Sequence, residues 1–351
     1  MHTHLSRVLL ATSLAAFLAL GAPAFAQSHA DDPTSTQTAA KPATKTAAET
    51  ATESAGDTTA DPAAERPLIE RSLLLVPAQA GDFELRRLAD YPGQPAMGAG
   101  VRYVHPDFPE LALDVFIYPL GDFTRTEALD WLENAMREEL RNVEASGRYE
   151  RVDFGDVIDI DLQRIDDDGT LLAPRADLVA ATGKFTVDTE DAKRDTERRI
   201  VAAMEGAQRA AEAVSDPDIG RRMAIRLREG GVEKQSASFL FYRSLYAIKA
   251  RSTAPVAMGP DTFDRLANHA IASILPAVEI RNAGGCADSE VVMDPDLDVE
   301  AGAIVLAAKM SYVQVRMRRN ACSKTLDETV PEGREGVVLD VASLWSGDGA
   351  P

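Results

Sequence analysis

Several short runs of the chain alternate apolar and polar residues, which is the pattern of half-buried β-strands. In the clearest run, over residues 111–117, four apolar side chains share one face. Pro and Gly residues separate the runs and favour turns between them. The run 237–251 is expected to form one strand that bends near Arg243 and Ser244. We predict three strands within residues 83–118, and further strands over residues 151–165, 222–229, 237–251 and 302–319.

Three other segments repeat apolar residues at spacings of three and four, the pattern of an amphipathic helix. The first begins with Thr124 and Glu127, which fit a capping box in which both side chains bind free backbone N–H groups. The second helix is expected over residues 189–215. The third is expected over residues 261–275, with Asp261 as its N-cap.

The order of these elements predicts the fold class. Runs of strands separated by helices favour an antiparallel sheet with helices packed on it. We therefore predict an α+β fold with a mainly antiparallel sheet, about three flanking helices and a C-terminal strand region closed by a disulfide. The expected parts are an α+β domain over residues 67–280, a C-terminal appendage packed on it over residues 281–346, and a flexible tail over residues 347–351.

The N-terminal segment, residues 1–26, has the three zones of a secretory signal peptide. Its apolar core is shorter than the roughly 20 residues that span a bilayer, and a retained membrane anchor is the alternative. We expect cleavage after Ala26, a periplasmic or extracellular address, and no transmembrane segment in the mature chain. Residues 27–66 are rich in Ala and Thr and are expected to form a disordered tether; a surface-attached or glycosylated stalk is the alternative.

The charge of the chain limits its partners. The formal net charge is −19. Binding to phosphate backbones depends on Lys and Arg, so this charge argues against nucleic acid as a partner and disfavours anionic lipid. A local basic patch remains able to bind a small anion.

The chain contains two cysteines, Cys286 and Cys322. A single pair in an exported protein is expected to form a structural disulfide, which would stabilise the fold by roughly 3–4 kcal/mol through loop-closure entropy. The pair lacks the Cys-x-x-Cys spacing of a redox site. No histidine lies near either cysteine in the sequence, which argues against a zinc site.

No catalytic motif is present, and the expected mature chain contains only His29, His105 and His269, which we expect to be solvated or capping residues. The alternating acidic residues between Asp294 and Glu300 lack the glycine and the final glutamate of a calcium loop. We therefore predict no catalytic residue, no bound metal and no cofactor. Paired carboxylates that cleave a polymer need only spatial proximity, so a hydrolase stays open as an alternative.

Five cations on the expected strands stand out in this acidic chain. The sequence favours cross-strand pairing of these cations with Asp159 and Asp161, which contributes about 0.2–1 kcal/mol per pair. The alternative is an anion-binding surface, because guanidinium and ammonium groups bind carboxylate and phosphate. The candidate anion-binding residues are Arg226, Arg228, Arg243, Lys249 and Arg251.

These observations favour a non-enzymatic exported domain that binds either another envelope protein or an anionic small ligand. One alternative is a hydrolase that acts on an envelope polymer through paired carboxylates. The other is a purely structural envelope protein.

Overall fold

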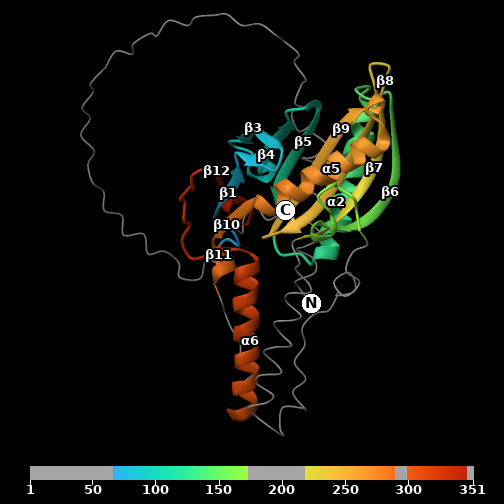
Figure 1. The fold of residues 1–351 in the computed structure, drawn as a ribbon. Coiled ribbons are helices and arrows are strands. Elements are labelled where there is room, and N and C mark those ends of the chain that lie inside the picture. Colours follow the sequence, from blue (N-terminus) through green and yellow to red (C-terminus); the bar gives the residue numbers. More distant parts are fainter. Residues whose placement is uncertain (1–65, 173–217, 289–298, 346–351) are drawn as a thin grey trace, which may run out of the picture.

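The computed structural model describes residues 66–172, 218–288 and 299–345, and Figure 1 shows their arrangement. The described part consists of two β-sheets and three α-helices. Several expectations lie outside these residues: the signal peptide, the tether before Arg66, the helix over residues 189–215 and the C-terminal tail.

The larger sheet has eight strands in the order β2-β3-β4-β5-β9-β8-β7-β6, and every neighbouring pair is antiparallel. The three strands predicted within residues 83–118 are β3, β4 and β5. The prediction of a mainly antiparallel α+β fold is confirmed. The bounds are β2 Gln79–Ala80, β3 Phe83–Asp90, β4 Ala99–His105, β5 Phe108–Pro119, β6 Arg151–Asp161, β7 Ile219–Glu229, β8 Val232–Arg243 and β9 Tyr246–Pro255.

The prediction of one bent strand over residues 237–251 is wrong, because the chain reverses within this run. β8 ends at Arg243 and β9 begins at Tyr246, so Ser244 and Leu245 form a two-residue hairpin turn. Both turn residues have positive φ angles, 51° and 69°. Positive φ at both positions is the signature of a type I′ turn, which asparagine and glycine normally occupy.

Burial and hydrogen bonds hold this unusual turn. Leu245 is fully buried, and its carbonyl accepts hydrogen bonds of 2.9 Å from the N–H groups of both Leu120 and Gly121. The carbonyl of Ser244 accepts a hydrogen bond from the side-chain amide of Asn282. These partners come from distant segments, so the local sequence carries no sign of the hairpin.

The smaller sheet has the strand order β11-β10-β1-β12. Its bounds are β1 Arg71–Pro77, β10 Glu279–Ala283, β11 Cys322–Ser323 and β12 Arg334–Asp340. β1 lies between β10 and β12 and is antiparallel to both. The boundary expected between residues 280 and 281 falls inside β10, so the C-terminal segment shares a sheet with the first strand of the described chain.

Two of the described helices match the predicted ones, α2 Arg125–Ala145 and α5 Pro260–Ile274. The capping box of α2 is confirmed, because the side chains of Thr124 and Glu127 each accept a hydrogen bond from the other residue's backbone N–H. The N-cap of α5 is Gly259, and the prediction of Asp261 is wrong. Pro260 starts the helix, because its fixed φ suits the first helical position.

The strand predicted over residues 302–319 is wrong, because this segment belongs to the helix α6 Val299–Arg319. The alternation of Val313, Val315 and Met317 suggested a strand. Apolar residues also recur there at helical spacings of three and four, and the first half of the segment is rich in alanine, the strongest helix former. Figure 1 shows α6 projecting away from the two sheets.

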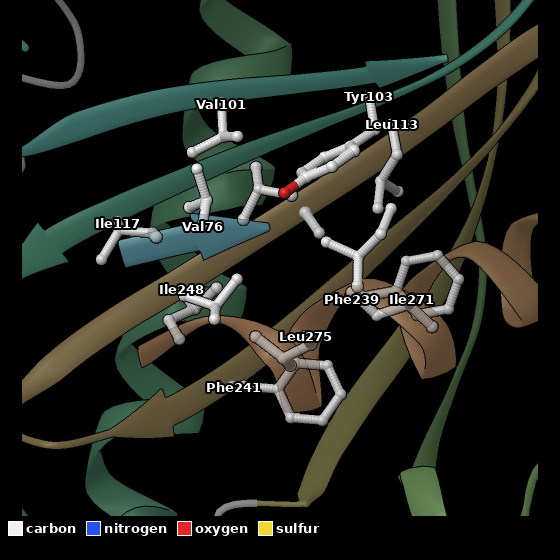
Figure 2. Close-up of a cluster of buried hydrophobic side chains, with 14 of the residues drawn as sticks. Val76, Val101, Tyr103, Leu113, Ile117, Phe239, Phe241, Ile248, Ile271 and Leu275 are labelled. Carbon is white, nitrogen blue, oxygen red and sulfur yellow. The ribbon is translucent and has the colours of Figure 1, made fainter. Parts of the chain in front are cut away.

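The main hydrophobic core lies between the larger sheet and a layer formed by α5 and the smaller sheet. α2 packs on the opposite face of the larger sheet, over β8, β6 and β9. Figure 2 shows how distant segments meet in the core, with labelled side chains from β1, β4, β5, β8, β9 and α5. They include Val76, Tyr103, Leu113, Phe239 and Ile271.

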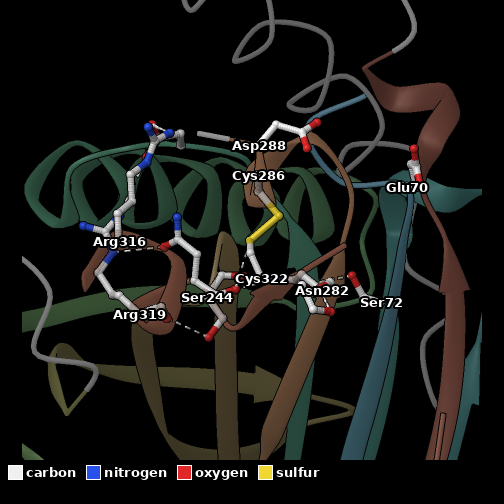
Figure 3. The surroundings of a disulfide bond; sticks show 12 residues. Glu70, Ser72, Ser244, Asn282, Cys286, Asp288, Arg316, Arg319 and Cys322 are labelled. Carbon is white, nitrogen blue, oxygen red and sulfur yellow. Dashed lines mark hydrogen bonds and ion pairs between the residues drawn. A yellow bond between two sulfur atoms is a disulfide. The ribbon is translucent and has the colours of Figure 1, made fainter. Parts of the chain in front are cut away.

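A chain of buried hydrogen bonds joins the two sheets. The hydroxyl of Tyr246 in β9 donates to Ser72 in β1 at 2.7 Å, and Ser72 donates to the side-chain carbonyl of Asn282 in β10 at 2.6 Å. The amide nitrogen of Asn282 donates to the carbonyls of Ser244 and Asn320 at 2.9 and 2.8 Å. Asn282 therefore links both sheets, the β8–β9 turn and the end of α6 (Figure 3).

The predicted disulfide between Cys286 and Cys322 is confirmed, with the two Cα atoms 5.9 Å apart. It lies beside Asn282, since Cys322 pairs with that residue across β11 and β10 (Figure 3). The bond closes the segment that contains α6. Among the helices of the described residues, none combines the length and apolar character needed to cross a bilayer.

We expect Asn282→Ala to lower the free energy of unfolding by about 2–4 kcal/mol, because it leaves buried hydrogen-bonding groups without a partner. The measurement is chemical denaturation of the exported protein. Asn142→Ala on the exposed surface of α2 is the control and should change stability by less than about 0.5 kcal/mol. Equal losses in the two variants would contradict the role given to Asn282.

Candidate anion-binding face

The hairpin turn separates the five predicted cations onto two faces of the larger sheet. In the register of β8 and β9, Arg243 lies opposite Tyr246, whereas Lys249 lies opposite Leu240 and Arg251 opposite Ser238. Residues directly opposite in an antiparallel pair share a face, and successive residues alternate. Arg243 therefore faces α5 and the smaller sheet, and Lys249 and Arg251 face the side of α2.

Arg243 is held within the fold. Its guanidinium donates to the carbonyls of Leu275 and Val278 at 2.8 and 3.1 Å and lies 3.3 Å from Asp218. Since these groups surround a half-buried side chain, Arg243 has a structural role at the end of α5.

Arg226 and Arg228 lie on the same face of the sheet as Arg243. They share the β7 face of Arg222, whose guanidinium forms an ion pair with Asp264 of α5. Arg228 lies 3.2 Å from Glu150 and 3.8 Å from Glu233. Arg226 is exposed, and no partner is found for it among the described residues.

The two aspartates expected to pair with these cations have other contacts. Asp159 lies 3.6 Å from Arg221, which is not one of the five. Asp161 is buried and accepts a hydrogen bond from the N–H of Gln163 at the end of β6.

The structure brings a different set of charges together on the α2 side of the sheet. Arg87 of β3 lies opposite Arg102 of β4, Arg102 lies opposite Asp114 of β5, and Asp114 lies opposite Arg251 of β9. These four residues, which we name the arginine row, cross four neighbouring strands on one face. The row holds three arginines and one carboxylate, in a chain whose net charge is −19.

The inner members of the arginine row neutralise each other. Arg102 donates two hydrogen bonds to the carboxylate of Asp114, at 2.7 and 2.9 Å, in the bidentate geometry that suits a guanidinium. Both side chains are about one-quarter exposed. The Arg102–Asp114 pair therefore contributes no net charge to the surface.

The two ends of the row differ in their surroundings. Arg87 is exposed at one end. Arg251, at the other end, donates to the hydroxyls of Tyr149 and Thr253 at 2.7 and 3.4 Å, and neither of these two partners carries a charge.

Lys249 lies next to the row, beneath α2. It is 4% exposed, and its ammonium donates to Glu139 of α2 at 2.5 Å. The ammonium also lies over the rings of Phe116 and Tyr118, 5.1 and 5.6 Å from their centroids. Burial alone would lower the pKa of Lys249, but the neighbouring Glu139 and Tyr118 outweigh it and raise the pKa above its ordinary value.

Two tyrosine hydroxyls beside Lys249 are buried without a hydrogen bond of normal geometry among the described residues, those of Tyr91 and Tyr118. Burial raises the pKa of Tyr118 to about 12, although the Lys249 ammonium opposes the shift. Burial also raises the pKa of Tyr91, which interacts electrostatically with Arg87, Lys249 and Asp114. Tyr91 therefore belongs to the same electrostatic environment as the arginine row and the buried lysine.

The coverage by α2 explains why these cations differ. α2 packs over β8, β6 and β9, and Glu139 reaches Lys249 from this helix. β3 and β4 lie at the other end of the sheet order, and Arg87 on this side is exposed. The covered cation has an acidic partner, and the uncovered end of the row meets solvent.

Sequence reasoning found Lys249 and Arg251 but missed Arg87, Arg102 and Tyr91. Arg87 and Arg102 lie in strands that the sequence predicted. Both arginines could therefore have been recognised as residues on the polar faces of those strands. Their alignment with Arg251 depends on the registers of three strand pairs, one of them with a bulge between Leu85 and Arg87. The sequence does not reveal those registers.

Of the three histidines expected to be solvated or capping, His29 lies outside the described residues and His105 is buried. His105 Nδ1 accepts a hydrogen bond from the N–H of Asp107, and its ring packs edge-on against Phe83. His269 lies 3.7 Å from Asp82. Within the described residues, no three His, Cys, Asp or Glu side chains are grouped closely enough to hold a metal ion.

Comparison with known proteins adds no identification, since neither a protein-family model nor a curated protein sequence matches this chain.

We expect Tyr118→Phe to lower the free energy of unfolding by less than Tyr242→Phe does, because the Tyr118 hydroxyl has no hydrogen bond of normal geometry and interacts with the Lys249 ammonium. Tyr242→Phe is the matched control. Its hydroxyl donates to the carbonyl of Gly121 and accepts from the N–H of Phe123, so this change should cost about 1–3 kcal/mol. Equal losses, measured by denaturation, would show that the Tyr118 hydroxyl is bonded within the fold.

Proposed function

We propose that this protein is exported to the cell envelope and binds an anionic ligand on the arginine row, without catalysing a reaction. The observation that carries the proposal is the alignment of three arginines and one aspartate across four strands. Arg87 is exposed at one end of the row, and Arg251 at the other end donates to two uncharged hydroxyls. Guanidinium groups bind carboxylate and phosphate with two parallel hydrogen bonds.

The supporting residues suit recognition of an anion. Tyr149 and Thr253 orient the Arg251 guanidinium without neutralising it. Phe116 lies opposite Lys249 on the same sheet face and is only partly buried, so it adds apolar surface beside the charges.

The carboxylates at this face favour binding over hydrolysis. Asp114 is held by Arg102, and Glu139 is held by Lys249. Because these carboxylate oxygens bind cations of the protein itself, they are less accessible to a glycosidic bond than free carboxylates would be.

Export is supported by the signal-like N-terminus and by the disulfide, because disulfides persist in oxidising compartments. We expect the protein recovered from the exported fraction to begin at Gln27. We also expect Cys286 and Cys322 to resist a thiol-labelling reagent until they are reduced. N-terminal sequencing that finds Met1 would refute cleavage, and labelling before reduction would refute the bond.

We expect one class of anion to raise the melting temperature of the exported protein, with an effect that weakens as salt is added. The measurement is a thermal-shift screen with phosphates, anionic sugars, peptidoglycan fragments and acidic peptides. Arg87→Gln and Arg251→Gln should each weaken binding about tenfold or more, since a hydrogen bond to a charged group contributes about 1.5–3 kcal/mol.

Arg226→Gln is the matched control, because it removes the same charge from the opposite face of the same sheet. It should leave binding unchanged. If all three variants lose the same affinity, the effect is one of net charge, and the arginine row is not the site. If no compound stabilises the protein, the proposal fails and a structural role in the envelope is favoured.

A further inference from the structure

The two described sheets have four edges, and three of them are protected against pairing with a further strand. β2 and β11 are edge strands of only two residues each. β6, at the other edge of the larger sheet, has a register shift between Phe154 and Val157, and it exposes Asp153, Asp156 and Asp159. Short strands, bulges and charged side chains are the usual means by which proteins protect a sheet edge.

β12 forms the fourth edge, and it is long and regular. Its seven residues pair with β1 in one unbroken register, without a bulge. The central residues Gly336, Val337 and Val338 carry no charge, and Gly336 is exposed. Val337 and Leu339 pack against the main core and hold the strand in place. Such an edge offers its backbone groups to another strand.

The hydrogen bonds to β1 show which backbone groups of β12 point outward. The carbonyl of Gly333 accepts a hydrogen bond of 2.9 Å from the residue just after β1, and the N–H of Val341 donates one of 3.0 Å to the residue just before β1. Hydrogen-bonded pairs alternate with pairs that are not bonded, so the odd-numbered residues of β12 bond to β1. The N–H and carbonyl groups of Gly336 and Val338 therefore point away from β1, where the sheet ends.

The sequence of β12 is complementary to itself. In an antiparallel pair centred on Val337, Arg334 of each copy lies opposite Asp340 of the other, and Gly336 lies opposite Val338. The outward-pointing backbone groups then face each other, whereas a shift by one residue would misalign them. This register pairs all seven residues of β12 and places one pair of opposite charges at each end.

Both charged residues are able to make this contact. Asp340 is exposed, and its carboxylate accepts a hydrogen bond from the N–H of Ala342 at 3.4 Å. One nitrogen of the Arg334 guanidinium donates to Glu279 of β10 at 3.1 Å. A guanidinium has five N–H donors, so Arg334 can keep this bond and bind a second carboxylate.

We propose that two copies of this protein pair through β12 and form a dimer with two-fold symmetry, in which the two smaller sheets join into one. A second copy presents the same strand, so each partner uses the same surface. The charges at both ends of β12 favour a second copy over an unrelated strand. The outer edges of the joined sheet are the two β11 strands, which have two residues each, so the assembly stops at a dimer.

The experiment measures the mass of the full exported protein by analytical ultracentrifugation over a range of concentrations. The ionic strength is about 0.15 M, where salt screens the repulsion between two acidic copies. We expect the mass to rise from monomer to dimer. Val338→Pro should raise the dissociation constant about tenfold or more, because proline lacks the N–H that would bond to the second copy. Proline is tolerated at an edge position whose N–H faces solvent, so the ladder with β1 remains.

Two charge reversals test the register. Arg334→Asp places two aspartates opposite each other at both ends of the interface, and Asp340→Arg places two arginines there. Each variant alone should therefore dimerise about tenfold more weakly than the natural chain. An equal mixture of the two variants should recover the natural affinity, because every charged pair in the mixed dimer is then attractive. Mixing does not alter the fold of either variant, so a loss of stability cannot produce this recovery.

Three results would overturn the proposal. The first is a natural chain that stays monomeric at every concentration. The second is a dimer that Val338→Pro leaves unchanged, since its interface would then lie outside β12. The third is a mixture of the two charge variants that dimerises no better than either alone, which would refute the pairing centred on Val337. None of these residues belongs to the arginine row, so the anion-binding role is tested separately.

Discussion

The buried side chain of Asn282 sets the constraint on which the arrangement of the two sheets depends. Its amide accepts from Ser72 of β1 and donates to the carbonyls of Ser244 and Asn320. A buried amide without partners costs about 1–3 kcal/mol or more. All of these groups are satisfied only when β1, the β8–β9 turn and the end of α6 lie in place together. The adjacent disulfide then holds the end of α6 against β10.

The hydrogen bonds of Asn282 also affect the arginine row, because they hold the β8–β9 turn in place. The carbonyl of Ser244 binds Asn282, and the carbonyl of Leu245 binds Leu120 and Gly121 just after β5. The turn therefore sets the register of β9 against both β8 and β5. A slip of one residue moves every side chain to the opposite face. It would exchange Arg251 for its neighbours and remove it from the line of Arg102 and Asp114.

Local patterns predicted the parts of the fold that local interactions determine. The capping box of α2 and the three strands within residues 83–118 are of this kind. The disulfide is not local, and it was predicted because the chain contains only two cysteines. The β8–β9 turn was missed because distant backbone groups hold Ser244 and Leu245, without a glycine to mark them. α6 was predicted to be a strand because Val313, Val315 and Met317 alternate with polar residues. The helical spacing of the other apolar residues in this segment was overlooked. The arginine row was missed because the alignment of its residues depends on the registers of three strand pairs, and the sequence does not reveal those registers.

The position of α2 explains why Lys249 is buried whereas Arg87, at the end of the arginine row, is exposed to solvent. Where the helix covers the sheet, Lys249 is removed from water, and an unpaired ammonium there would be costly. Glu139 removes that cost. Arg87 remains in contact with water, which screens its repulsion from Arg102. β3 and β4 lie at the end of the sheet away from the strands that α2 covers. If the proposed ligand binds the row, this open end is the side from which it approaches.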